Sequence, residues 1–272
     1  MEKQILNNLT VVVPIKGKLN EPDTNFLKLA LTSIESNKGY QPSKVLIVHT
    51  TDTDIETIKT LSTLTNVSFY LNDSVDTDFC SQINLATKNK IDTEYFSILE
   101  LDDEYSAIAF DVFNEYSTFY KTASVLVPAI FDIDMQGNFL KFNGVDTLSR
   151  GFVQEGDLGV ITHELSKNLT SQILSGAFIK TTDFNDCGGL KKNIKISFMY
   201  EFLLRATHQD LNVVVLPKLC YLHRNLREGS YLKTLNDSNI TKEEVLFWYE
   251  SAKKEYYYPK DRVVEYKIAE VV

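Results

Sequence analysis

Short apolar runs alternate with amphipathic segments along the first hundred residues. Leu9–Ile15 and Val45–His49 are continuously apolar, which is typical of strands buried on both faces. Between them, apolar residues recur at helical spacing, and Gly39 stands where a helix commonly ends. The expected strands are Leu9–Ile15, Val45–His49, Val67–Leu71 and Thr93–Leu101, and the expected helices are Asn25–Asn37, one capped by Asp54, and Asp78–Asn89. This alternation predicts a mostly parallel sheet flanked by helices, with right-handed crossovers.

The second half of the chain mixes hairpins with helices. A turn at 134–138 predicts that Val125–Asp132 and Phe139–Asn143 form a β-hairpin. The other expected strands are Ser175–Lys180, Asn212–Leu216 and Leu219–His223, the last two separated by Pro217, and the expected helices are Tyr105–Tyr120, Ile196–His208 and Lys242–Glu255. No repeat and no low-complexity linker interrupts the chain, so we expect a single domain.

The composition is that of an ordinary soluble globular protein. The 272 residues are 43% hydrophobic and 24% charged, and the net charge of −9 argues against broad nonspecific binding to nucleic acid. No stretch approaches the roughly 20 apolar residues that span a bilayer, and the first residues lack the apolar core of a signal peptide. Cys80, Cys187 and Cys220 are few and widely spaced, which predicts free thiols packed in the core. We therefore expect a cytoplasmic protein.

An abrupt cluster of acids ends the fourth expected strand. Glu100, Asp102, Asp103 and Glu104 place four carboxylates within five residues, and these repel one another unless a cation lies among them. On an extended backbone, Glu100 and Asp102 point to one side and Asp103 to the other. Hard divalent cations take such oxygen ligands and commonly keep substrate phosphates as partners. The cluster is either a metal site for a phosphorylated substrate or a solvated acidic turn.

Three polar loops are expected at one edge of the sheet. Pro14–Lys16, His49–Asp52 and Glu100–Asp103 each follow a parallel strand, and ligands bind outside the carboxyl ends of such strands. No Gly-x-Gly-x-x-Gly follows the first strand, and no Gly-x-x-x-x-Gly-Lys-Ser/Thr occurs in the sequence. The sequence therefore does not favour a dinucleotide-binding or P-loop enzyme.

With these elements placed, the chain resembles family-2 glycosyltransferases of the GT-A fold, from about Leu9 to Tyr231. The resemblance rests on VVVPIK, LKLALTSIES, KVLIVHTTDTD, ILELDD, SGAFIK…CGGLKK, FLLR and VVVLPKLCYLHR, in that order. It implies an α/β fold with a Rossmann-like, mostly parallel sheet. It also implies one domain over 1–272, with a nucleotide-binding half (1–121), an acceptor half (122–235) and a C-terminal helix and tail (236–272).

The resemblance implies roles for residues that follow the first strand and precede the late helix. Pro14, Ile15 and Lys16 would line the nucleotide pocket, although Lys16 can equally be a solvated loop lysine. Gly188 and Gly189 would let the backbone approach the donor sugar or the acceptor, or they form a simple turn.

A metal site is implied in the same way. Glu100 and Asp102 occupy the two acidic positions of the family's Asp-x-Asp, and Asp103 follows directly. Asp102 would be the main ligand of Mn²⁺ or Mg²⁺, bridging it to the diphosphate. His223 matches a position that completes the metal shell in some GT-A enzymes, or it is a histidine at a strand end.

The sequence departs from the family pattern at the second strand. Two aspartates usually end this strand, one of them gripping the base, whereas this chain has His49 and Thr50, followed by Thr51 and Asp52. Thr50 and Asp52 are therefore the candidates for nucleotide binding here.

A second departure concerns the general base. The Glu-Asp pair expected near the start of the late helix is missing, and the stretch reads SFMYE. Glu201 follows one turn later, with Arg205 four residues on and so on the same helix face. Glu201 is either a displaced catalytic base or the partner of Arg205. Asp183 and Asp186, before the glycine pair, are the further candidates.

These features predict a metal-dependent glycosyltransferase. It would move a sugar from a nucleoside-diphosphate sugar, a UDP-sugar by resemblance, to a hydroxyl with inversion. The alternatives are a catalytically silent module of the same fold and a sugar-1-phosphate nucleotidyltransferase. The acceptor is open among a glycan, a lipid-linked sugar, a protein and a modified DNA base. We expect its selectivity to reside in Asn143–Asn168 and Tyr256–Val272.

Overall fold

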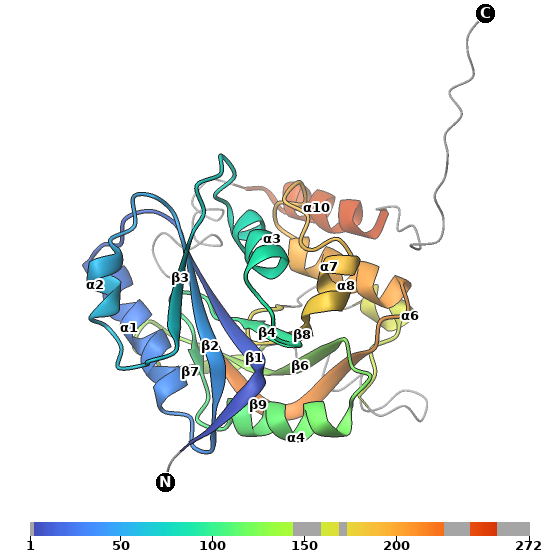
Figure 1. Ribbon diagram of the computed structural model, residues 1–272. Coiled ribbons are helices and arrows are strands. Elements are labelled where there is room, and N and C mark those ends of the chain that lie inside the picture. The colour runs from blue at the N-terminus through green and yellow to red at the C-terminus, as the bar shows by residue number, and fades with distance from the viewer. Residues whose placement is uncertain (1–2, 144–158, 169–172, 226–239, 255–272) are drawn as a thin grey trace, which may run out of the picture.

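One mixed sheet of nine strands forms the centre of the computed structural model, which describes residues 3–143, 159–168, 173–225 and 240–254 (Figure 1). The strands are β1 (Gln4–Ile15), β2 (Tyr40–His49), β3 (Val67–Leu71), β4 (Tyr95–Ile98), β5 (Glu104–Tyr105), β6 (Val125–Ile133), β7 (Phe139–Asn143), β8 (Phe178–Lys180) and β9 (Val213–Arg224). The helices are α1 (Glu21–Glu35), α2 (Ile55–Lys59), α3 (Phe79–Asn89), α4 (Ala109–Phe119), α6 (His163–Ser166), α7 (Thr181–Asp186), α8 (Phe198–His208) and α10 (Lys242–Lys254).

The strand order is β3-β2-β1-β4-β8-β6-β9-β5, with β7 paired to β6. The first four strands are parallel, as the alternating pattern predicts. β8 is antiparallel to both β4 and β6, and it joins the two halves of the chain into one sheet. β6 and β9 are parallel, and the predicted β6–β7 hairpin is present. The sheet is therefore continuous from the first half to the second.

Helices cover both faces of the sheet. α1 and α4 pack on one face around side chains such as Leu27 and Phe110. α3, α7 and α8 pack on the other face, through side chains that include Ile83, Phe184 and Phe202, and Figure 1 shows them on the side opposite α4. α10 lies outside α8. The result is a three-layer α/β arrangement with a core on each face of the sheet.

Local sequence signals explain where the helices begin. Asn20, Asp54 and Asp78 each accept a hydrogen bond from a backbone N–H in the first turn of α1, α2 and α3. These caps satisfy N–H groups that the helix itself leaves without partners. The cap at Asp54 is the one that the sequence predicts.

Several expected elements have different bounds in the structure. The two short strands expected on either side of Pro217 form one continuous strand, β9. This is possible because the pairing of β9 with β6 shifts between Pro128 and Ala129, which leaves Pro217 outside the ladder. A bulge of this kind accommodates a residue that has no N–H to donate. β4 ends at Ile98, so the acids follow it in a loop, and the expected helix Tyr105–Tyr120 begins only at Ala109, after the short strand β5.

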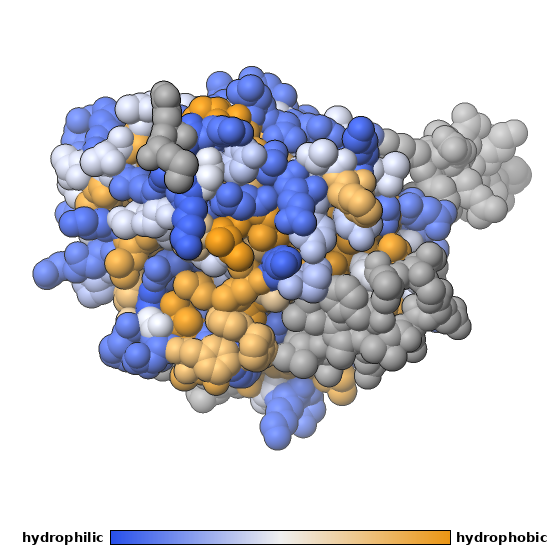
Figure 2. Space-filling model, turned by 90° about the horizontal axis from the view of Figure 1, so that it is seen from below, coloured by the Kyte–Doolittle hydropathy of each residue, from blue (hydrophilic) through white to orange (hydrophobic). Residues whose placement is uncertain are grey.

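The surface carries both charged and apolar groups. Figure 2 shows apolar side chains gathered among hydrophilic ones on the face seen from below. Phe139, Leu140 and Phe142 of β7 are exposed, whereas all three cysteines are buried free thiols, as expected. No helix within the described ranges is long and apolar enough to cross a bilayer. Most of the predicted acceptor-selecting segments, namely residues 144–158 of the first and all of Tyr256–Val272, lie outside the described residues.

Candidate functional site

The loops after β1 and β2 are hydrogen-bonded to each other. The N–H of Gly17 donates to Oγ1 of Thr50 (2.9 Å), and Oγ1 of Thr53 donates to the carbonyl of Gly17 (3.1 Å). Thr50 in turn donates to Oδ1 of Asp52 (2.5 Å). The hydrogen bond from Thr50, with a smaller contribution from the charge of Lys16, holds the pKa of Asp52 below its usual value. The structure thus brings Thr50, Asp52 and Lys16 together at one edge of the sheet.

Pro14 and Ile15 end β1 at this same edge. They pair with Val48 and His49 of β2, and Lys16 follows them as an exposed residue. The loop after β4 lies next to them, since the N–H of Leu99 donates to the carbonyl of Val12 (2.9 Å). The three polar loops therefore converge at the carboxyl ends of β1, β2 and β4, where α/β sheets bind ligands.

Asp103 is the most deeply buried member of the acidic loop, with 1% of its surface exposed. Its Oδ1 accepts a hydrogen bond from the N–H of Arg224 (2.7 Å), while its Oδ2 is buried with no hydrogen-bond partner among the residues that the structure describes. Burial, with the charges of Glu100 and Asp102, raises the pKa of Asp103 well above its usual value, and His223 opposes this rise. A buried carboxylate oxygen without a partner is costly, so it suggests a ligand.

Arg224 shapes the acidic loop from β9. Its Nε donates to the carbonyl of Asp102 (2.9 Å), and its Nη1 donates to the carbonyl of Asp134 (2.8 Å). Its Nη2 pairs with the carboxylate of Glu104. Because these bonds engage backbone and side chain at once, Arg224 holds the loop in one conformation against the end of β9.

His223 lies beside the acids and is held by a carboxylate from β6. Its Nδ1 is 2.9 Å from Oδ1 of Asp132, its direct neighbour in the parallel register. Burial by itself would lower the pKa of His223. The hydrogen bond to Asp132 and the charges of Asp103, Glu100 and Asp132 outweigh burial and raise that pKa to about 9. His223 therefore belongs to the same charged cluster as Glu100 and Asp103.

Glu100 is anchored at the base of the cluster. Oγ of Ser175 donates to its Oε1 (2.5 Å), and its own N–H donates to the hydroxyl of Tyr221 (3.0 Å). Tyr221 packs against Gly176, where a Cβ would lie 2.3 Å from the Tyr221 ring. A glycine is required here both by this close approach and by its φ of +77°.

The chemistry of these groups fits a divalent cation. Asp102 is 7% exposed, Oδ2 of Asp103 is without a partner, and Nε2 of His223 makes no hydrogen bond within the described ranges. Carboxylate oxygens and imidazole nitrogen suit Mn²⁺, and Mg²⁺ is commonly held by one or two carboxylates together with substrate phosphates. No three His, Cys, Asp or Glu side chains in the described part of the chain form a ready-made metal site. Phosphate oxygens would have to complete the shell, so the metal site stays a prediction.

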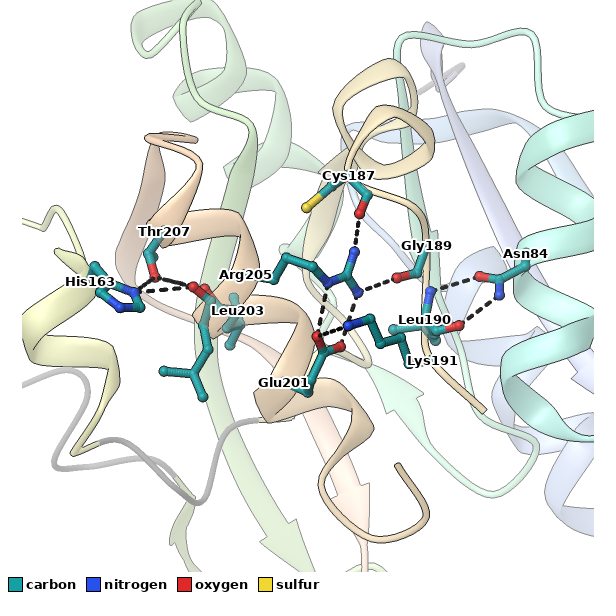
Figure 3. A network of polar contacts seen from close by, with 11 residues as sticks. Asn84, His163, Cys187, Gly189, Leu190, Lys191, Glu201, Leu203, Arg205 and Thr207 are labelled. Carbon is teal, nitrogen blue, oxygen red and sulfur yellow. Dashed lines mark hydrogen bonds and ion pairs between the residues drawn. The ribbon is translucent and has the colours of Figure 1, made fainter. Parts of the chain in front are cut away.

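Glu201 is fully buried and lies in a network of ion pairs on α8 (Figure 3). Its Oε1 and Oε2 are 2.9 Å and 3.0 Å from Nε and Nη2 of Arg205, and Nζ of Lys191 is 3.3 Å from Oε1. Of the two interpretations that the sequence leaves open for Glu201, the structure contains the pair with Arg205. A base at this position would have to give up two cations before it could take a proton.

The same network fixes the predicted Gly188–Gly189 turn. Arg205 donates to the carbonyls of Cys187 and Gly189, the latter at 2.6 Å, and Figure 3 shows the guanidinium between α8 and this loop. Gly188 and Gly189 have φ of +93° and +65°. Asn84 of α3 closes the loop by bonding both the N–H and the carbonyl of Leu190 at 2.8 Å. The glycines are thus a turn locked between α3 and α8.

Asp183 and Asp186 lie away from the acidic loop. β8 runs antiparallel to β4 with Lys180 opposite Tyr95, so α7 starts at the beginning of β4 and the acids follow its end. Asp183 is half-buried and Asp186 is exposed. The structure therefore does not bring these two carboxylates to the edge that carries Glu100, Asp102 and His223.

Several residues of the cluster carry no sequence signal. Asp132 is a single acid inside an apolar strand, and Ser175 and Tyr221 read as ordinary core residues. Arg224 follows His223 directly, which is the only local hint of its position. Register between β6 and β9, which the sequence does not reveal, brings Asp132 to His223.

The comparison with known proteins rests on structure. No family model matches the chain, and no curated protein matches it in sequence. The structure matches that of S. aureus TarS residues 1–349 in complex with UDP-GlcNAc, with a TM-score of 0.58 and 14% identity over 84% of this chain and 61% of that one. It also matches the same TarS fragment in complex with UDP, with a TM-score of 0.55 and 14% identity over 80% and 60% of the two chains.

A longer TarS structure matches as well, with a TM-score of 0.56 and 15% identity over 88% of this chain and 41% of the other. The chain thus spans about 61% of the TarS fragment matched first. At this low identity the likeness defines the fold: the chain has an α/β GT-A fold, as the resemblance implied.

Proposed function

We propose that the protein is a nucleotide-sugar-dependent glycosyltransferase that uses a UDP-sugar and Mn²⁺ or Mg²⁺. The observation that carries this proposal is the buried Oδ2 of Asp103, which has no hydrogen-bond partner among the described residues and lies in a cluster of acids with His223, at the ligand-binding edge of a GT-A fold. TarS, which shares the fold, has been crystallised with UDP-GlcNAc and with UDP, and this supports the choice of donor.

The donor would lie across the three converging loops. Pro14, Ile15 and Lys16 would face the nucleotide, and the Thr50–Asp52 pair would offer a carboxylate to the N–H of a uracil ring. Asp102, with Glu100, Asp103 and His223, would hold the cation. When bound, the cation neutralises the charge that grows on the leaving diphosphate.

Transfer with inversion would require a carboxylate that takes the proton of the acceptor hydroxyl. Glu201 is bound to Arg205 and Lys191, and Asp183 and Asp186 lie toward the other end of β4. Glu201 lies on α8, whereas the other two acids lie on α7. For Glu201 to act as the base, its ion pairs with Arg205 and Lys191 would have to open when the acceptor binds.

This arrangement favours one second candidate, a module that binds a nucleotide sugar without transferring the sugar. In such a module the donor cluster would be intact while Glu201 serves only to hold the Cys187–Lys191 loop. The two candidates share the donor site and differ in whether a base reaches the acceptor.

A thermal-shift screen of nucleoside diphosphates with and without Mn²⁺ tests the donor site. A ligand at 100 times its Kd stabilises by about 2.7 kcal/mol, which corresponds to roughly 5–10 °C in a domain of this size. We expect UDP with Mn²⁺ to give the largest shift and UDP without metal a smaller one. Equal, negligible shifts for all diphosphates would contradict the proposal.

Release of UDP from UDP-sugars in the presence of Mn²⁺ separates the two candidates. A transferase is expected to hydrolyse its donor slowly even without an acceptor, because water can replace the hydroxyl. A protein that binds UDP with Mn²⁺ but leaves every UDP-sugar intact would be the silent module.

A further inference from the structure

α8 approaches the acidic loop through Met199, a half-buried residue of its first turn. The N–H of Leu174 donates to Sδ of Met199 over 3.3 Å. The next residue along the chain, Ser175, donates to Oε1 of Glu100 (2.5 Å). Two adjacent residues therefore join the side chain of Met199 to the first acid of the loop.

Met199 and Glu201 leave α8 in different directions. Residues two apart on an α-helix point about 200° apart around its axis. Glu201 is fully buried against Arg205 and Lys191, and Figure 3 shows its side chain turned toward the loop that carries Lys191. Met199 instead faces the segment that supports the acidic loop. Of these two residues, it is Met199 that borders the ligand-binding edge of the sheet.

A methionine sets the chemistry of this border. A thioether sulfur is a weak hydrogen-bond acceptor and has no proton to donate. The preceding residue, Phe198, packs against Phe79 of α3, with ring centroids 5.6 Å apart. Met199, Phe198 and Phe79 are all partly buried apolar side chains that pack on the core between the sheet and α3. The first turn of α8 therefore offers the ligand-binding edge an apolar, polarisable surface.

We propose that Met199 lines the nucleotide-sugar site, as the residue through which α8 borders the donor, and gives this side of the site an apolar, uncharged wall. A substrate would meet this wall with an uncharged group, because an anionic group here would lie near Glu100. The inference rests on the proposed function, since that function places the donor at the acidic loop. It requires a nucleotide at this edge and no metal ion.

The test places a charge at position 199 and, as a control, at the other end of the same helix. Met199→Lys and Met199→Glu are compared with Gln209→Lys and Gln209→Glu. Gln209 caps α8 ten residues further on, about 15 Å along the helix axis. α8 leads into β9, which is parallel to β4 and so begins at the edge opposite the acidic loop. Isothermal titration calorimetry measures the affinity of each variant for UDP, whose diphosphate is negatively charged.

We expect opposite effects of the two charges at position 199. In the buffer, with or without Mn²⁺, in which the unaltered protein binds UDP more tightly, Met199→Lys should tighten UDP binding and Met199→Glu should weaken it, each by roughly 3- to 10-fold at low salt. Both effects should shrink at high salt, because ions screen the added charge. The two Gln209 variants should bind UDP like the unaltered protein.

A purely structural role for Met199 gives a different result. Both variants would then lose thermal stability and keep the same UDP affinity, which would overturn the inference and leave the proposed function standing. Equal changes in the Met199 and Gln209 pairs would also overturn it, because they would follow from net charge alone. If the unaltered protein binds no UDP, the proposed donor fails and this inference fails with it.

A charge introduced after folding covers the case in which a charged variant does not fold. Met199→Cys is purified in its folded form and then modified with a methanethiosulfonate that carries either a trimethylammonium or a sulfonate group. Cys80, Cys187 and Cys220 are buried, so the reagent should react first at position 199. We expect the trimethylammonium adduct to bind UDP more tightly than the sulfonate adduct. Equal affinities of the two adducts would overturn the inference.

Discussion

Two buried carboxylates, Asp103 and Glu201, lie in very different surroundings. Both are at most 1% exposed. Glu201 has both oxygens bound to the guanidinium of Arg205, with Lys191 as a second cation. Asp103 has one oxygen on a backbone N–H and the other without a partner in the described ranges, while further carboxylates surround it.

The difference distinguishes a structural cluster from a binding cluster. A buried charge is tolerated when it is paired, and a network such as that of Glu201 is complete without any ligand. Asp103 instead keeps one buried oxygen without a hydrogen-bond partner among the described residues, and the charges of Glu100 and Asp102 lie near it, so a bound cation would stabilise it. The two sites are therefore distinguished by whether each buried carboxylate oxygen has a hydrogen-bond partner. In the sequence, each site is only a set of acids near basic residues.

The largest effect is expected for Glu201→Gln. Removing the charge leaves Arg205 buried without its counter-ion, and breaking a buried ion pair costs about 3–5 kcal/mol. Denaturant unfolding should show this loss of stability. The double variant Glu201→Gln/Arg205→Met gives the coupling between the two side chains. A Glu201→Gln protein of unchanged stability that has lost donor turnover would make Glu201 a catalytic base and remove the contrast with Asp103.

Gly176→Ala tests how the acidic cluster is supported. The new Cβ would lie 2.3 Å from the ring of Tyr221, whose hydroxyl binds the N–H of Glu100. Overpacking costs about 1–3 kcal/mol, and the left-handed backbone adds roughly 1–2 kcal/mol. Gly137→Ala is the matched control, because its φ is +86° but nothing lies within 4 Å. Equal losses of stability in the two variants would show that Tyr221 moves aside freely.

Asp102→Ala should affect binding and turnover and leave the fold intact. Asp102 is more exposed than Asp103 (7% against 1%), and Arg224 holds its backbone carbonyl, which the substitution retains. We expect a loss of at least about 100-fold in Mn²⁺-dependent UDP affinity or donor hydrolysis, the upper end of what changes behind a metal ligand cause. The melting temperature should stay within a few degrees. Normal activity in this variant would remove Asp102 from the metal site.

The smallest effect is expected for Asp78→Ala, which provides a reference for a carboxylate with a purely local role. Its oxygens accept from the N–H and hydroxyl of Ser81 at the start of α3, and losing such a cap costs about 1 kcal/mol. Burial raises the pKa of Asp78, but the bonds from Ser81 outweigh it and leave the pKa below its usual 3.8.

The pH dependence of this variant follows from the lowered pKa. The cap contributes fully above the unfolded-state pKa of Asp78 and is lost as the pH falls through the folded-state pKa. Unfolding free energies of the two proteins should therefore differ at pH 7 and converge in acid. A difference that persists below that range would assign the effect to something other than the charged cap.

Local pattern was sufficient to predict much of the fold. The apolar runs of β1, β2 and β3 and the capped start of α2 are short-range signals, and all four elements are present. β3 has the predicted bounds, whereas β1 and β2 end where predicted but begin earlier, at Gln4 and Tyr40. The single strand β9 across Pro217 was not predicted, because its bulge depends on pairing with β6, whose residues lie about 90 positions earlier in the chain. The boundaries of β4 and α4 differ from the predicted ones for a similar reason. Glu104 and Tyr105 form β5, which pairs with β9, so these residues are not part of the helix.

The sequence by itself determined the alternating α/β order, the convergence of three polar loops at one sheet edge and the acidic run after β4, because strand direction and residue periodicity act over short distances. Only the tertiary structure decided the roles of the charges. It put Asp132 behind His223, clamped the acidic loop with Arg224 and placed Glu201 between Arg205 and Lys191. The physical reason is that the state of a buried charge depends on neighbours brought by register and packing from distant parts of the chain.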